Sequence, residues 1–597
     1  MNVRKLAQRF GFNTYGRKQL QRDLIAGCTV GIIAIPLGMA FAIASGVKPE
    51  TGLYTTIIAG ILISLFGGSR FQIGGPTGAF IPVLLAIVLQ YGYDKLLVAG
   101  FLAGILLVVM GLLRLGALIR FIPRPVTVGF TAGIAVTIFT GQIGSFLGLT
   151  GLQRHESFLL NMKEIGLHLH TINLYSVAIA LLCLTALLLI PRVLPRIPAS
   201  LVGLLTATLF SVWLWSGKVA TIGSAYGEIP AALPGLHGLD LSWSTIVLMI
   251  QPACIIALLG SIESLLSAVV ADEMSGTRHR ANRELIGQGI ANMITPLFGG
   301  IPATGAIART ATNIKSGAFS KVSGIVHGLV VLLVLLLLAP YASAIPLSSM
   351  APILMVVAWN MSERRSFAAI LRLRNGDSLV LLVTFLLTVG TTLTLAVEVG
   401  LALSMIMFVY KSAAAQQIRQ VVPDHQLRHG KVAPLSAHAG DSNTMHCERL
   451  SIFTLQGPLF FGSVNPFEQP EFVQAYRPEG VLLLRMGRVS LIDASGEARL
   501  RTLHNQISQH GGRLLLSGLV AQPLHLLKRS GLLHQIGEQC CFDHTGEAIS
   551  AALQTDNRTC CINCAGGPYR ECRALCTNSD RLSDSSERSV SAETAIL

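Results

Sequence analysis

The sequence predicts a polytopic α-helical membrane protein, with fourteen segments in a 7+7 inverted repeat, followed by a small cytoplasmic α/β domain. Three observations support this fold class. The chain has 597 residues, is 51% hydrophobic and only 13% charged, which excludes a soluble enzyme, a disordered chain and a secreted disulfide scaffold. Two short Gly/Pro/Thr motifs recur in the apolar part. After Tyr410 the pattern changes to alternating strands and helices.

Apolar segments account for most of residues 1–410. About 18 apolar residues can span a bilayer, and shorter segments are tolerated where protein surrounds them. The segments lie near residues 24–43, 53–66, 78–90, 96–113, 126–147, 173–190, 199–216, 244–270, 284–298, 305–314, 322–339, 346–359, 378–393 and 395–410. The third and tenth are too short and too rich in Gly, Thr and Pro to cross alone. An even number of segments places both termini on one side.

The net charge of +14 indicates the orientation. Residues 1–410 hold 27 Lys and Arg against 14 Asp and Glu, whereas residues 411–597 hold 18 and 17. With a cytoplasmic N-terminus, the cytoplasmic segments hold 21 Lys and Arg and the opposite loops hold five. The positive-inside rule therefore predicts that both termini are cytoplasmic, and the protein is expected in the cytoplasmic membrane. A nucleic-acid partner is not expected, because a nucleic-acid binder of this net charge would need a much larger charged fraction than 13%. Because the first apolar run continues past any small-residue cleavage site, we expect a retained helix rather than a signal peptide.

Two related motifs mark the third and tenth segments. The first reads Gly74-Gly75-Pro76-Thr77-Gly78-Ala79, and the second reads Gly300-Ile301-Pro302-Ala303-Thr304-Gly305-Ala306. Each is third in a set of seven spans, and an odd number of spans inverts the second set. Paired interrupted helices in inverted repeats point to a transporter's binding site.

The two motifs favour an anion as the ligand. A half-helix that begins within the membrane exposes unpaired N–H groups and the positive end of its dipole. Glycine lets a ligand approach the backbone, and Thr77 and Thr304 add hydroxyl donors. The alternative is that the Gly-Pro breaks only kink packed helices, which does not explain matched motifs at matched positions.

Ionisable residues inside the spans are candidates for function because their burial is costly. Glu263, with Ser267 one helical turn later, is interpreted as a cation or proton site, the alternative being a structural carboxylate. Arg309 either attracts substrate, pairs with Glu263 or lies at the cytoplasmic edge. Glu398 and His327 are interpreted as structural.

Five regions are expected along the chain. They are an N-terminal segment (1–22), the transport domain (23–411), a linker (412–445), an α/β domain (446–555) and a Cys-rich tail (556–597). In the α/β domain we predict two β-rich runs over 448–464, strands over 481–486 and 513–519, and helices over 494–509 and 522–530. It contains no phosphate loop, dinucleotide motif or catalytic triad, so an enzyme is not expected.

Seven of the 11 cysteines lie in the last 58 residues. The spacing of Cys561, Cys564, Cys572 and Cys576 would suit zinc. A disordered tail with free thiols is the favoured interpretation, since a cytoplasmic location disfavours disulfides.

Several sequence blocks resemble the sulfate permease (SulP) family of anion transporters over about residues 15–550. They are IIAIPLGMAFAIASGVKPETGLYTTIIAGILISLFGG, SRFQIGGPTGAF, LLGSIESLLSA, FGGIPATGAIARTATNI and GPLFFG followed by LIDASG. The resemblance implies core and gate domains, an elevator-like movement, a cytoplasmic STAS domain, and homodimerisation through the gate edge and the STAS domain.

The resemblance also implies roles for individual residues. The anion-binding positions of the family match Thr77, Gly78, Ala79, Thr304, Gly305, Ala306 and Phe41. Glu263 matches the acid of the eighth span, but sodium-coupled relatives have Asp there with Thr one turn later, so Glu263 and Ser267 leave Na⁺ or H⁺ coupling open. Leu37 replaces a residue that is polar in many relatives. Ser495 matches a phosphorylated serine of anti-sigma antagonists and is interpreted as structural.

Together these observations predict secondary active transport of a small inorganic oxyanion, sulfate or bicarbonate, with Na⁺ or H⁺ as the co-transported ion and no other cofactor. The expected partners are the anion, membrane lipid and a second copy of the chain. The alternatives are a chloride or anion exchanger, a C4-dicarboxylate–H⁺ symporter, and a membrane-tethered STAS sensor or scaffold.

Overall fold

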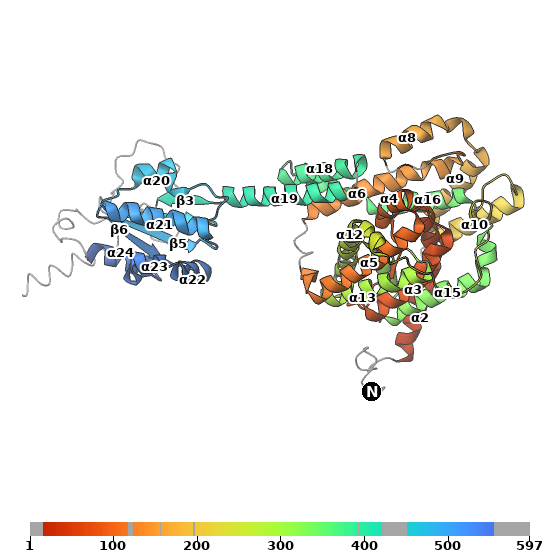
Figure 1. Cartoon of the computed structure of the whole chain (residues 1–597), viewed down its shortest axis with the longest axis horizontal. Coiled ribbons are helices and arrows are strands. Elements are labelled where there is room, and N and C mark those ends of the chain that lie inside the picture. Colours follow the sequence, from red (N-terminus) through yellow and green to blue (C-terminus); the bar gives the residue numbers. More distant parts are fainter. Residues whose placement is uncertain are drawn as a thin grey trace, which may run out of the picture. The chain divides into compact units, whose positions relative to one another are not determined.

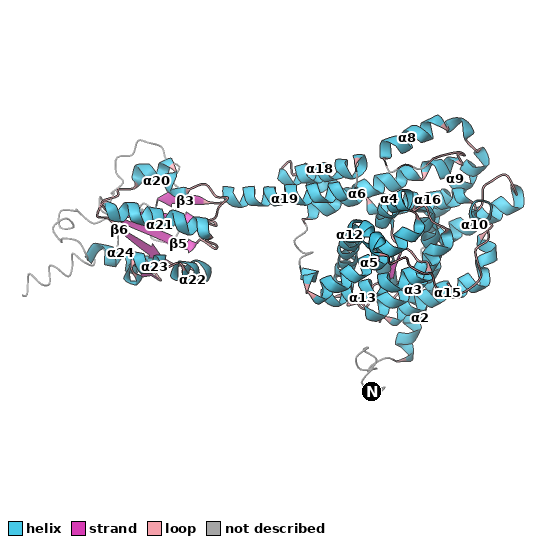
Figure 2. Cartoon of the chain, viewed as in Figure 1, coloured by secondary structure: helices cyan, strands magenta, loops and turns pink. Residues whose placement is uncertain are grey.

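The computed structural model describes residues 16–117, 123–153, 155, 157–194, 198–391, 393–420 and 450–554. The chain divides into two compact units, Met1–Ser404 and Met405–Leu597. Within the described residues, the first unit is almost entirely helical, and the second is built on a sheet flanked by helices (Figure 1, Figure 2).

Every one of the fourteen predicted segments coincides with a helix. Among the described residues, eight helical stretches are long and apolar enough to cross a membrane. The fourteen helices are α2 (Arg17–Ala44), α3 (Pro49–Phe66), α4 (Ile81–Tyr91), α5 (Tyr93–Leu112), α6 (Arg124–Gly141), α9 (Leu174–Val193), α10 (Ala199–Leu214), α12 (Trp243–Ser275), α13 (Ala281–Ile294), α14 (Ile307–Lys315), α15 (Val322–Ala342), α16 (Leu347–Met361), α18 (Gly376–Gly390) and α19 (Leu393–Ala414).

Helix packing follows the inverted repeat. The fourth helix, α5, packs against α12 and α13, and its counterpart in the second set, α15, packs against α2 and α3. Likewise α6 packs against α18, and α16 packs against α9. The predicted fold class is therefore confirmed. We call α2–α5 and α12–α15 the core, and α6, α9, α10, α16, α18 and α19 the gate.

Glycines allow the closest helix contacts of the core. A Cβ atom added at Gly52 of α3 would lie 2.0 Å from the carbonyl oxygen of Gly38 on α2. A Cβ atom at Gly289 of α13 would lie 2.6 Å from the carbonyl oxygen of Gly104 on α5. Small residues at such crossings let membrane helices gain van der Waals contact along their backbones.

The second unit contains a five-stranded sheet in the order β3-β4-β5-β6-β7. The first pair is antiparallel and the other three pairs are parallel. The predicted strands and helices are confirmed except for the second β-rich run within 448–464, and helix α21 lies at the predicted bounds. The elements are β3 (Gln417–Gln420), β4 (Leu450–Gln456), β5 (Val481–Arg488), β6 (Arg513–Ser517), β7 (Cys541–Phe542), α21 (Ala494–Gln509), α22 (Ala521–Arg529) and α24 (Thr545–Gln554).

Two local predictions in this unit were wrong. The second β-rich run within 448–464 forms only an isolated bridge between Leu459 and Ile492, because Gly457, with φ +85°, turns the chain out of the sheet. The predicted linker contains strand β3, whose four residues have no alternating apolar pattern and are held by pairing with β4. Residues 421–449 and the cysteines Cys561, Cys564, Cys572 and Cys576 lie outside the described residues.

Candidate functional site

The two motifs meet in the core as a short antiparallel ladder. Strand β1 (Gly74–Gly75) pairs with β2 (Thr304–Gly305), so that Gly74 faces Gly305 and Gly75 faces Thr304. The first segment continues through a 3₁₀ turn (Gly78–Phe80) into α4, and the second continues into α14. Two helices from opposite repeats therefore begin beside one ladder.

The start of each half-helix is set by an extended residue. Thr77 precedes the turn that leads into α4 with φ −130° and ψ 157°, and Ala306 precedes α14 with φ −92° and ψ 108°. The first N–H groups of a helix have no partner within the helix and form the positive end of its dipole. This arrangement favours an anion at the ladder.

Glu263 of α12 reaches the first motif. Its side chain is partly buried, and its Oε2 atom accepts a hydrogen bond from the Thr77 hydroxyl over 3.0 Å. Ser267, one turn later on the same helix, donates to Thr310 Oγ1 over 3.2 Å, and the same Thr310 oxygen accepts from the backbone N–H of Ile73. Ser267 thus helps to fix α14 against α12, and Thr310 joins α14 to Ile73, directly before the first motif.

Arg309 lies inside the core rather than at the cytoplasmic edge. Its side chain is 3% exposed, and its Nη2 atom donates to the Pro76 carbonyl oxygen. A Cβ atom on Gly75 would lie 2.6 Å from Arg309 Nη1, and Gly75 has φ +147°. Glycine therefore lets the guanidinium lie directly against the backbone of the first motif.

Ser264 holds the second motif and was missed by sequence reasoning. Its hydroxyl oxygen lies 2.6 Å from Thr304 Oγ1 and accepts a hydrogen bond from the Gly305 N–H over 3.2 Å. The Ser264 carbonyl oxygen accepts from Gln72 Nε2 over 3.1 Å. Its position directly after Glu263 could have marked Ser264 as a candidate site residue. It was missed because adjacent residues on a helix point to different faces.

Helices of both the core and the gate surround Gly78. A Cβ atom at this position would lie 3.6 Å from Phe41 Cε1 on α2, 3.4 Å from Ile138 Cδ1 on α6 and 2.9 Å from Met361 Sδ on α16. Phe41, Thr77, Ala79, Thr304 and Ala306 are all buried. The predicted substrate residues are therefore enclosed where the core meets the gate.

A cavity of ≈ 850 Å³, here called the vestibule, lies beside this enclosed region. Core residues Ile81 and Pro82 and gate residue Ile138 line it, and Ile138 also adjoins Gly78. The seven predicted substrate residues do not line it. Sequence reasoning missed the vestibule because its wall is assembled from separate helices and a connecting loop. Glu398, which we interpreted as structural, lies in this wall.

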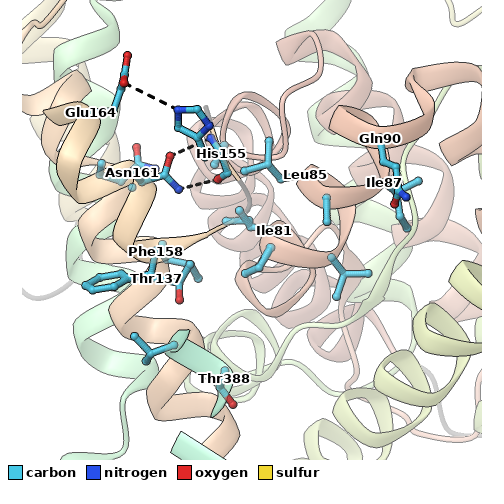
Figure 3. Close-up of a pocket in the computed structure, with 18 of the residues that line it drawn as sticks. Ile81, Leu85, Ile87, Gln90, Thr137, His155, Phe158, Asn161, Glu164 and Thr388 are labelled. Atoms are coloured by element: carbon cyan, nitrogen blue, oxygen red, sulfur yellow. Dashed lines mark hydrogen bonds and ion pairs between the residues drawn. The ribbon is translucent and has the colours of Figure 1, made fainter. Parts of the chain in front are cut away.

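One part of the vestibule wall contains His155, which precedes a short helix, and Asn161 and Glu164, which lie on that helix (Figure 3). Asn161 accepts from the backbone N–H of His155 over 2.9 Å and donates to its carbonyl oxygen over 2.6 Å. His155 Nε2 lies 3.8 Å from Glu164 Oε2. These contacts fix α8 (Phe158–Leu167) against the preceding chain.

In the second unit, Asp493 caps α21. Its carboxylate accepts from the backbone N–H of Gly496 over 2.8 Å and of Phe461 over 2.9 Å. Ser495 lies in the first turn of this helix and is partly buried. Among the described residues, no group of three or more His, Cys, Asp or Glu is placed to hold a metal ion.

Fold and site together define a class: a multi-pass membrane transporter with paired half-helices, followed by a small α/β domain. The chain belongs to the sulfate permease family, which it matches over residues 20–384, and residues 443–548 match the STAS domain. The predicted family is confirmed, and the family and its homologues are transporters rather than enzymes.

Two relatives span nearly the whole chain. The Bacillus subtilis protein named "Putative sulfate transporter YvdB" is 52% identical over 90% of this chain and 98% of its own length. The bicarbonate transporter BicA of Picosynechococcus is 27% identical over 90% of this chain and 95% of its own.

Solved structures share the fold. The murine anion transporter Slc26a9, in an inward-facing state, aligns with a TM-score of 0.79 and 20% identity over 91% of this chain and 92% of its own. The transmembrane domain of a cyanobacterial BicA aligns with a TM-score of 0.57 and 28% identity over 65% of this chain and 98% of its own.

Proposed function

We propose that this protein is a secondary active transporter of a small inorganic oxyanion, sulfate or bicarbonate, across the cytoplasmic membrane. The observation that carries the proposal is the pairing of Gly74–Gly75 with Thr304–Gly305, which brings two helix N-termini to one place. The relatives named for sulfate and for bicarbonate support this substrate class.

The proposed substrate site uses the positive ends of the two half-helices. Such helix ends bind an anion without a neutralising lysine, and small residues let the anion approach the backbone. Phe41 closes one side of the site next to Gly78. The proposed site consists of Thr77, Gly78, Ala79, Thr304, Gly305, Ala306 and Phe41, with Arg309 supplying positive potential from behind the first motif.

Glu263 is the proposed coupling residue. A carboxylate in a membrane span is costly unless it binds a cation or a proton, or is otherwise compensated. The Glu263 carboxylate accepts a hydrogen bond from the hydroxyl of Thr77, and Thr77 belongs to the proposed anion site. Binding of the anion and the charge of Glu263 therefore influence each other. Na⁺ or H⁺ binding here would offset the charge of the anion.

In the proposed cycle, the core slides against the gate in an elevator-like movement, carrying the ladder past Ile138 and Met361. The imbalance of 21 against five basic residues supports cytoplasmic termini. A homodimer, formed through the gate edge and the STAS domain, is part of the same proposal.

Flux measurements in liposomes test the proposal. Purified full-length protein is assayed with labelled bicarbonate, sulfate and fumarate under imposed Na⁺ or H⁺ gradients, together with Glu263→Gln. Glu273→Gln is the matched control, since Glu273 is exposed on the same helix. We expect gradient-driven accumulation of one oxyanion that Glu263→Gln uncouples and Glu273→Gln leaves unchanged.

Each alternative function gives a different result in this assay. Gradient-independent flux that is unchanged by Glu263→Gln would refute coupled symport in favour of exchange or conduction. Preferential accumulation of fumarate would indicate a dicarboxylate symporter. Anion binding without flux would indicate a sensor or scaffold.

A further inference from the structure

One carboxylate in the vestibule wall is unused by the proposed mechanism. Glu398 of α19 is exposed and lines the vestibule. Within the described part of the chain it has no hydrogen-bonding or ion-pair partner. A membrane-span carboxylate that faces an aqueous cavity is an expected place for function.

The described vestibule wall carries no compensating positive side chain. Its acidic residues are Glu164 and Glu398, and it contains no Lys or Arg. Glu164 is held by His155 and His168, at 3.8 and 3.5 Å, and by the backbone N–H of Gln153 at 3.3 Å. The remaining polar lining consists of uncharged side chains, including Gln90, Gln142, Gln251, Thr137 and Thr388. Arg154 and Glu156, on either side of His155 in the chain, are of opposite charge and lie outside the described residues.

The vestibule adjoins the proposed substrate site. Its lining residue Ile138 comes within 3.4 Å of a Cβ position on Gly78. It also contains Gln90 and Tyr91 at the end of α4, which the proposed topology places on the outer side. An anion that enters from outside therefore passes Glu398 before it reaches the half-helix ends.

We propose that Glu398 is a charge filter that favours monovalent over divalent oxyanions, so that bicarbonate-like anions enter more readily than sulfate. This inference rests on the proposed function and its topology. The repulsion between a fixed carboxylate and a passing anion is proportional to the charge of the anion. Neutralising Glu398 therefore changes the logarithm of the entry rate twice as much for a dianion as for a monoanion. The effect is screened by salt, because the Debye length is about 10 Å at 0.1 M.

The test compares Glu398→Gln with the wild-type full chain in intact cells, where added anions reach only the outer face. Initial uptake of labelled bicarbonate and sulfate is measured well below saturation, at ionic strengths of about 0.02 and 0.3 M, and is normalised to surface protein. At low salt, we expect Glu398→Gln to raise bicarbonate uptake about twofold and sulfate uptake about fourfold. At high salt, the ratio of uptake by Glu398→Gln to uptake by the wild type should fall towards one for both anions.

Two variants keep the test specific. Glu398→Asp retains the charge and should behave like wild type. Glu228→Gln removes an exposed carboxylate that does not line the vestibule, and it should change neither uptake rate. If one anion is not transported, its inhibition constant against the other, applied from outside, replaces its uptake rate.

Equal gains for both anions, gains that do not depend on salt, or no change in Glu398→Gln would overturn the filter while leaving the proposed function intact. Absence of both uptake and competition by either oxyanion in the wild type would instead overturn the proposed function.

Discussion

The Thr77 hydroxyl donates a hydrogen bond to Glu263 over 3.0 Å, although the two residues are 186 positions apart in the sequence. The contact joins the end of the first motif to the carboxylate of α12. The proposed anion site and the proposed coupling site therefore share a direct hydrogen bond, which gives a physical route for coupling between them.

Replacing Thr77 by Val should weaken both substrate binding and coupling. A hydrogen bond to a charged group is worth about 1.5–3 kcal/mol, so we expect KM for the transported anion to rise about tenfold or more, with an altered Na⁺ or H⁺ dependence. Thr77→Ser retains the hydroxyl and should be near wild type. Thr131→Val is the matched control because Thr131 bonds only to carbonyl oxygens of its own helix. An unchanged KM and ion dependence in Thr77→Val would contradict the shared site.

Replacing Ser264 by Ala should loosen the second motif. The change removes the acceptor for the Gly305 N–H and the partner of Thr304 Oγ1. Loss of one or two neutral hydrogen bonds, at about 1 kcal/mol each, predicts a rise in KM of about fivefold to thirtyfold. Ser261→Ala on the same helix is the control, because its hydroxyl bonds to Leu258 of that helix. Equal kinetics in the two variants would refute a role for Ser264.

Adding a methyl group inside the ladder should be far more damaging than adding one at an open glycine. A Cβ atom at Gly305 would lie 1.7 Å from Gln72 Nε2, whereas one at Gly166 would meet nothing within 4 Å. We expect Gly305→Ala to lower kcat/KM at least about tenfold and to reduce thermal stability, since backbone or buried side chains must shift. Gly166→Ala should leave both unchanged. Wild-type transport by Gly305→Ala would show that the ladder is not required.

Lys321, directly before α15, should give the protein a pH-dependent stability. Its ammonium donates to the carbonyl oxygens of Leu65 and Gly67 over 3.3 and 2.5 Å. Burial, reinforced by Arg283, lowers the pKa of Lys321 to about 8. Between about pH 8 and the ordinary lysine pKa near 10.5, the unfolded chain therefore binds more protons at this residue than the folded chain. Its contribution to stability thus rises with pH in this window.

The measurement for Lys321 is the thermal unfolding midpoint in detergent from pH 7 to 11, compared with Lys321→Met. The midpoint of the wild type should rise relative to that of the variant between about pH 8 and 10. Lys315→Met is the control, because Lys315 is exposed. A constant difference between wild type and Lys321→Met across this range would contradict the lowered pKa.

Long apolar segments and repeated motifs were readable from the sequence because their signals are local. A membrane span needs only enough consecutive apolar residues, so all fourteen segments, including the short α4 and α14, were predicted near their observed positions. The 7+7 repeat followed from the matching positions of two Thr-Gly-Ala motifs. Helix α21 was predicted at its bounds because it lies between two strongly apolar strands.

Contacts between distant segments were not readable in the same way. From the sequence, Arg309 could attract substrate, pair with Glu263 or lie at the cytoplasmic edge. In the structure its guanidinium donates a hydrogen bond to the carbonyl oxygen of Pro76. Ser264 was missed, although it contacts both Thr304 and Gly305. Strand β3 was assigned to a linker because its partner strand follows a long intervening segment.

The sequence by itself determined the membrane architecture, the likeness between the two half-helices and the presence of a carboxylate in the eighth span. Hydrophobicity and motif spacing are properties of contiguous residues, so they can be read without knowledge of the packing. Only the tertiary structure decided that Thr77 meets Glu263, that Ser264 holds Thr304, and that Glu398 faces a cavity. These relationships depend on how helices rotate and pack against partners far along the chain, and side-chain direction on a helix is settled by that packing rather than by composition.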